Sequence, residues 1–133
     1  GCVYLPFAGY HYRQHAASMS HALPPQSLDD QRAVALHIRE SVPAQWPALQ
    51  QSADAFYYEK LVYLTSMILR REDITPYRVQ YGEMLIAISS GLKDRRLGRN
   101  PRLPLVMRLS AAATVRYPAL WRKLCRNYLK DRQ

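Results

Sequence analysis

Cysteine, glycine and long apolar runs are all scarce in this chain of 133 residues. Its two cysteines, Cys2 and Cys125, lie at opposite ends, so they form neither a disulfide framework nor a zinc ligand set. Reduced thiols are therefore expected, and they favour an intracellular protein. No segment approaches the roughly 18 consecutive apolar residues that a membrane-spanning helix requires. With only 5 glycines, the chain also lacks a Gly-rich phosphate-binding loop.

The sequence also lacks the short motifs of common catalytic and metal sites. It contains no nucleophile elbow and no His-Glu-x-x-His segment. His11 and His15 have a spacing that puts two imidazoles on one helical face, but no carboxylate precedes Asp29 to complete a ligand set. Cys125 falls on an apolar helix face, where a buried and inert thiol is expected. The sequence therefore predicts no catalytic role, no metal and no cofactor.

Apolar side chains recur every three or four residues through most of the chain, and no stretch shows the period of two that a strand requires. This pattern predicts an all-α fold, a compact bundle of about five helices. Pro43 is expected to end the first helix, Thr75 to cap the third, and Gly91 to supply the left-handed residue after it. The predicted helices cover about residues 27–42, 47–71, 75–90, 104–116 and 118 onward.

The apolar rows predict which face of each helix meets the core. Tyr58 and Tyr63 fall off the row of the second helix, so we expect them to be exposed and treat them as candidates for protein contact. The rows expected to face inward are Val34, Ile38 and Val42, then Tyr57, Leu61, Leu64 and Ile68, then Tyr77, Tyr81, Met84, Leu85 and Ile88, then Leu105, Leu109, Ala112 and Ala113, and finally Leu120, Trp121, Leu124, Cys125 and Tyr128.

Residues 1–26 show no helical period but are rich in aromatic side chains. Because disordered segments are poor in aromatic residues, we expect an extended arm packed on the core of a single helical domain, residues 27–133. The chain begins with Gly1 instead of Met, which indicates a processed or excised product, part of a larger assembly or a longer chain. Whether Cys2 is acylated stays open.

Acidic residues are nearly absent from the last third of the chain. Residues 91–133 hold 12 basic and 2 acidic side chains, whereas residues 1–90 hold 7 and 8, and the formal net charge is +9. Like charges at this density repel one another, and a protein retains them where a polyanion or an acidic partner neutralises them. Arg outnumbers Lys 15 to 4, and its planar guanidinium suits bidentate contact with phosphate or carboxylate.

The basic side chains of this region, residues 91–133, form two sets. One set lies in a loop between two predicted helices, and the other follows one face of the last helix at a spacing of about four residues. We expect both sets to be exposed. The candidate anion-binding residues are Lys93, Arg95, Arg96, Arg99 and Arg102 in the loop, and Arg122, Lys123, Arg126 and Lys130 on the helix.

Several partners compete for these charges. No segment has the short turn of a helix-turn-helix, so backbone contact is favoured over base reading if nucleic acid binds. We expect a non-catalytic domain that binds nucleic-acid backbone as a subunit of a larger complex. The main alternative is an interaction, adaptor or scaffold domain, for example of a secretion or effector system, that docks an acidic protein. An anionic membrane contact by the last helix, and a solvated face without a partner, also stay open.

Overall fold

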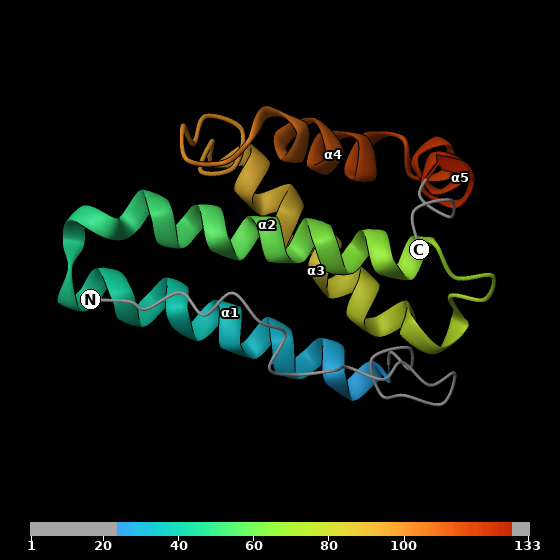
Figure 1. The fold of residues 1–133 in the computed structure, drawn as a ribbon, viewed down its shortest axis with the longest axis horizontal. Coiled ribbons are helices and arrows are strands. Elements are labelled where there is room, and N and C mark those ends of the chain that lie inside the picture. The colour runs from blue at the N-terminus through green and yellow to red at the C-terminus, as the bar shows by residue number, and fades with distance from the viewer. Residues whose placement is uncertain (1–23, 129–133) are drawn as a thin grey trace, which may run out of the picture.

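The computed structural model describes residues 24–128 as five α-helices and two short 3₁₀ helices, with no strand in that range (Figure 1). The predicted all-α bundle is confirmed. None of the described helices is long and apolar enough to cross a membrane. The elements are α1 (Pro25–Gln45), η1 (Pro47–Leu49), α2 (Gln50–Leu69), η2 (Thr75–Tyr77), α3 (Arg78–Lys93), α4 (Leu105–Arg116) and α5 (Pro118–Tyr128).

Helix α2 forms the centre of the bundle. It runs antiparallel to α1, α3 crosses it from behind, α4 lies on the side opposite α1, and α5 packs near its end (Figure 1). The predicted core row of α2 is confirmed, because Tyr57, Leu61, Leu64 and Ile68 are all buried. The helices packed around α2 also bury the polar Thr65, whose hydroxyl donates to the Leu61 carbonyl at 2.9 Å.

Helix α1 differs from its predicted bounds at both ends. It begins at Pro25, before the expected cap, so the predicted arm lies outside the described residues except for its last three. Pro43 does not end the helix, which continues to Gln45. A proline breaks the hydrogen bond to the carbonyl four residues earlier, and this costs little here because only two helical residues follow. The row containing Val34 is also wrong, since that side chain is exposed while Leu28 and Ala35 are buried.

The ends of α3 were predicted at the wrong residues. Thr75 does not cap the helix through its side chain; it opens η2, and its own N–H donates to Asp73 Oδ1 at 2.8 Å. Gly91 lies inside α3 and is buried, so it is not the left-handed residue. That conformation belongs to Arg95, with φ of 60°, four residues further along. The expected core residues Met84 and Ile88 are buried.

Helices α4 and α5 expose much of the apolar surface that was predicted to face inward. In α4, Leu105 and Leu109 are exposed, and the buried residues are instead Ser110, Ala111 and Thr114. Small side chains on this face let α4 approach α2 and α3 closely, and the Thr114 hydroxyl is satisfied by the Ser110 carbonyl at 2.7 Å. In α5, Cys125 is buried as expected, whereas Leu120 and Leu124 are exposed.

Candidate anion-binding site

The segment between α3 and α4, residues 94–104, is a loop with its own buried side chains. Leu97 and Leu103 are fully buried, and Asn100 between them is almost fully buried. Buried anchors at every third position, Leu97, Asn100 and Leu103, leave the intervening residues exposed. The loop is therefore fixed to the bundle from inside, and its charged side chains are held on the outside.

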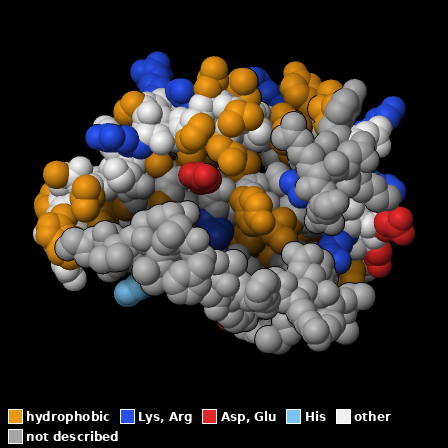
Figure 2. Space-filling view, viewed as in Figure 1, with side chains coloured by type: hydrophobic (Ala, Val, Ile, Leu, Met, Phe, Trp, Pro, Cys, Tyr) orange, Lys and Arg blue, Asp and Glu red, His pale blue; other side chains and the backbone are white. Residues whose placement is uncertain are grey.

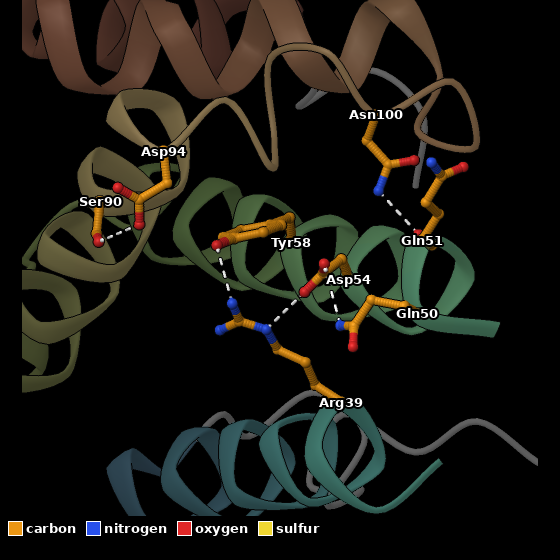
Figure 3. A network of polar contacts seen from close by, with 8 residues as sticks. All are labelled: Arg39, Gln50, Gln51, Asp54, Tyr58, Ser90, Asp94 and Asn100. Atoms are coloured by element: carbon orange, nitrogen blue, oxygen red, sulfur yellow. Dashed lines mark hydrogen bonds and ion pairs between the residues drawn. The ribbon is translucent and has the colours of Figure 1, made fainter. Parts of the chain in front are cut away.

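Asn100 connects this loop to the start of α2. Its Nδ2 donates to the carbonyl of Gln51 at 2.8 Å (Figure 3). Its Oδ1 accepts from the backbone N–H of Arg102 at 2.9 Å. Both polar ends of the buried amide are thus paired, as a buried amide requires. The Asn100-Pro101 dipeptide is a turn signal, but its bond to Gln51 spans 49 positions and has no local signature.

Backbone hydrogen bonds define the path of the loop further. The N–H of Leu97 donates to the Gly91 carbonyl at 3.0 Å, and the N–H of Arg99 donates to the Arg95 carbonyl at 3.0 Å. From the other side, Arg108 Nη1 of α4 donates to the Gly98 carbonyl at 3.4 Å. The loop is therefore held by local backbone bonds and by contacts to α2 and α4, where the sequence suggested only a connection between helices.

All five cations that the sequence predicted for the loop are exposed, although Lys93 belongs to the last turn of α3 and only four lie in loop 94–104. Within residues 24–128, none of them forms an ion pair or a side-chain hydrogen bond, and the nearby Asp94 accepts a hydrogen bond from Ser90 at 3.4 Å instead. Arg95, Arg96 and Arg99 line a shallow depression of about 280 Å³ against the start of α2. These cations are Lys93, Arg95, Arg96, Arg99 and Arg102.

A partly buried ion pair lies beside this depression. Arg39 of α1 donates from Nε to Asp54 Oδ1 at 2.7 Å, and Gln50 Nε2 donates to the other carboxylate oxygen at 3.3 Å (Figure 3). The Arg39 guanidinium also lies over the rings of Tyr57 and Tyr58, at 4.7 and 5.2 Å from their centroids. Because Arg39 neutralises Asp54, Asp94 is the one carboxylate in the lining that opposes the three arginines. The depression therefore carries a net positive charge.

The cations of α5 behave differently from the prediction. Arg122 is half-buried, and its Nη2 donates to the carbonyl of Glu72 at 3.0 Å, which makes it a structural contact between α5 and the α2–η2 connection. Together with Lys123 and Arg126 it also lines a shallow depression of about 330 Å³ on α5. Lys123 and Arg126 are exposed, and Lys130 lies outside the described residues.

The two basic sets do not come together. Loop 94–104 lies at one end of α4 and α5 lies at the other (Figure 1). A helix of 12 residues separates them by about 18 Å. The exposed surface of α4 between them is mostly apolar, with Leu105, Val106 and Leu109 outermost and Arg116 in the last turn. The loop and α5 are therefore two separate basic surfaces. We take the loop as the main candidate site, because Arg122 of α5 is partly committed to the Glu72 carbonyl.

The two tyrosines proposed for protein contact have opposite positions. Tyr58 is only 2% exposed and packs against Gly91 and Arg39, so its prediction as an exposed contact is wrong. Tyr63 is exposed and lines a groove between α2 and α4 together with Phe56 and Met107. Lys60 Nζ lies 5.7 Å from the centre of the Tyr63 ring.

The described residues offer no alternative reactive centre. Burial raises the pKa of the Cys125 thiol, and this outweighs the opposing effects of Arg70 and the Ser66 hydroxyl. No group of three His, Cys, Asp or Glu side chains that could hold a metal ion occurs among residues 24–128. His11 and His15 lie outside that range.

Comparison with known proteins gives no relative from which to interpret the site. No protein-family model, no curated protein and no solved structure matches this chain. The function is therefore argued from the chemistry of the loop itself.

Proposed function

We propose that this domain binds the phosphate backbone of nucleic acid through loop 94–104, without catalysis, as a subunit of a larger complex. One observation carries the proposal: a loop fixed from inside by Leu97, Asn100 and Leu103 presents four arginines that have no partner of their own within the described part of the chain. Lys93 precedes them in the last turn of α3. The forked donors of arginine match phosphate oxygens.

The fixed loop favours binding because its backbone is ordered before the partner arrives. Ordering a flexible loop on binding costs free energy and therefore weakens the affinity. Here the contacts to Gln51, Gly91 and Arg108 order the loop before binding, so less of this free energy is lost when the partner binds. Non-specific binding to nucleic acid depends mainly on neutralising phosphates, so an exposed cluster of cations is sufficient for it.

The composition of the depression favours a polyanion over a protein as its occupant. Apart from Pro101, its lining consists of charged or amide side chains. Stable protein interfaces have a core enriched in aromatic and apolar residues, which this surface lacks. An acidic protein remains the second candidate, because its carboxylates would pair with the same arginines.

The test is the salt dependence of binding to random-sequence oligonucleotides, single- and double-stranded, followed by fluorescence anisotropy. We expect dissociation constants in the micromolar range at about 50 mM salt that rise steeply with salt. Each phosphate contact on duplex DNA contributes about −0.9 to the slope of log K against log salt. Charge reversal of Arg95, Arg96 and Arg99 to Glu should therefore make that slope shallower by about 2 to 3.

The matched control is charge reversal at Lys123 and Arg126, which are equally exposed but lie on α5. This double variant should lose much less affinity than the loop variant. No binding at low salt would refute the proposal. Equal loss in both variants would show that net charge, and not the loop, determines binding.

A further inference from the structure

Helix α4 buries its small side chains and exposes its large apolar ones. The side that faces α2 and α3 buries the small residues Ser110, Ala111 and Thr114. The opposite side carries Leu105, Val106 and Leu109, which are 62%, 65% and 61% exposed. The apolar stripe of a helix normally faces the core, because exposed apolar surface costs free energy. In α4 the bundle leaves this stripe uncovered.

This second side, here called the α4 outer face, consists of Leu105, Val106, Leu109, Ala112 and Ala113. Their spacing puts them on one stripe of the helix. Figure 2 shows hydrophobic side chains gathered along the edge of the molecule where Figure 1 draws α4. The alanines leave room for a second helix to approach closely, while the leucines and the valine supply apolar area.

Further apolar side chains are exposed around α4. On the side of α4 that faces α2, Phe56, Tyr63 and Met107 line a separate groove of about 400 Å³, together with Glu59 and Lys60. Beyond the last turn of α4, Tyr117 and Leu120 are also exposed. Exposed apolar patches mark protein interaction sites in soluble proteins.

The basic side chains beside the α4 outer face indicate which kind of partner can bind it. Helix α4 carries two basic side chains, Arg108 and Arg116, and no acidic one. Arg102 precedes it, and helical spacing puts Arg116 on the same stripe as Leu105 and Leu109. A second copy of the chain would bring these cations together. In an antiparallel α4 pair Arg108 of one copy would face Arg116 of the other, and in a parallel pair each arginine would meet itself. Such like-charge contacts disfavour self-association.

We infer that the α4 outer face binds an amphipathic helix with acidic flanks from a partner protein. The apolar stripe of that helix packs on Leu105, Val106 and Leu109, and its carboxylates pair with the bordering arginines. The surface lies beside loop 94–104 and shares Arg102 with it, but its apolar stripe and Arg116 take no part in the proposed nucleic-acid contact. The inference therefore does not depend on the nucleic-acid proposal.

The test uses three labelled synthetic peptides of about 18 residues, which is long enough to cover α4. The first has Leu at helical spacing and Glu elsewhere. The second has the same Leu stripe with Lys in place of Glu, and the third is a scramble of the first. At about 150 mM salt, where long-range attraction is screened, the acidic amphipathic peptide should bind at least about tenfold more tightly than either other peptide.

Two double variants separate the α4 outer face from apolar surface in general. Leu105→Ala with Leu109→Ala should weaken peptide binding at least about tenfold, because most of the apolar contact is removed. Val79→Ala with Ile86→Ala is the control, since these α3 side chains are exposed to a similar degree, 67% and 72%. It should leave binding unchanged. Arg116→Glu should weaken binding of the acidic peptide and strengthen that of the basic one.

Other outcomes overturn the inference. Sedimentation that shows a dimer dissociated by the Leu105/Leu109 variant would assign the face to a second copy. Binding to vesicles with anionic headgroups that is lost in the same variant would assign it to a membrane. Equal affinity for all three peptides would remove the basis for an acidic helix. The loop variant at Arg95, Arg96 and Arg99 should retain peptide binding. The peptide test can therefore fail while the oligonucleotide test succeeds, and the reverse.

Discussion

The ring of Tyr58 lies directly against Gly91, so that a Cβ placed on Gly91 would be only 2.4 Å from Tyr58 Cε1. This contact sets how closely α3 crosses α2. Gly91 also accepts the N–H of Leu97 through its carbonyl, at the start of the basic loop. The position of loop 94–104 thus depends on the absence of a side chain at one residue of α3.

Gly91→Ala is therefore expected to destabilise the fold. The added methyl group meets the buried Tyr58 ring, and overpacking of this kind costs about 1–3 kcal/mol, more than the ~1 kcal/mol that Ala contributes over Gly in a helix. Gly82→Ala is the matched control in the same helix, because nothing lies within 4 Å of a Cβ there. It should stabilise the protein by about 0.5–1 kcal/mol. Urea unfolding followed by circular dichroism measures both, and equal effects would contradict the packing argument.

The helices were predictable because their apolar period is local information. The row through Tyr57, Leu61, Leu64 and Ile68 needs no knowledge of distant residues, and it is buried as expected. The apolar period does not say whether the large or the small side chains of a helix face the core. In α4 the small side chains fit against α2 and α3 and are buried, while the large ones are exposed.

The charged residues of the candidate site could be predicted from the sequence, but the hydrogen bonds that hold the site in place could not. The loop cations follow from composition, and they are exposed as expected. Asn100 is held by Gln51, and Arg122 by the carbonyl of Glu72, each about fifty positions away. Neither contact has a local signature. Long-range hydrogen bonds of this kind hold the loop in place and give Arg122 of α5 a structural role, and neither could be inferred from local sequence.

The Arg39–Asp54 pair provides a second prediction. Asp54→Ala should destabilise the protein by about 3 kcal/mol, because it leaves a partly buried guanidinium without its carboxylate. Glu40→Ala is the control, since Glu40 follows Arg39 on α1 but is exposed, and it should change stability by less than about 0.5 kcal/mol. A thermal or urea unfolding comparison decides, and a small effect of Asp54→Ala would show that the stacked tyrosines alone hold Arg39.

The buried thiol of Cys125 provides a prediction on reactivity and pH. In a Cys2→Ala background, where Cys125 is the single thiol, it should react with Ellman's reagent at least about a hundredfold more slowly than a free thiol until the protein unfolds. Fast reaction of the folded protein would contradict the burial.

The raised pKa also links Cys125 to stability. Since the folded thiol holds its proton to higher pH than the unfolded thiol, its contribution is fully present below the unfolded pKa of about 8.5. It is lost as the pH rises from there through the folded pKa. Cys125→Ala should remove that part of the pH dependence in unfolding measurements above neutrality.

Asn100→Ala tests whether the loop must be fixed in order to bind. The substitution removes the hydrogen bonds to Gln51 and Arg102 while every charge remains. If ordering of the loop contributes to affinity, the dissociation constant for an oligonucleotide should rise by about tenfold, corresponding to roughly 1.4 kcal/mol of ordering cost. Asn127→Ala, at an exposed position on α5, should have no effect.

A second measurement on Asn100→Ala separates loop order from global stability. Amide hydrogen exchange at Arg102 should accelerate in this variant, because its N–H loses the Asn100 acceptor, while the core of α2 stays protected. Faster exchange together with unchanged oligonucleotide affinity would show that the cations bind equally well from a loosened loop. The proposal would then rest on charge alone, without the contribution of the fixed backbone.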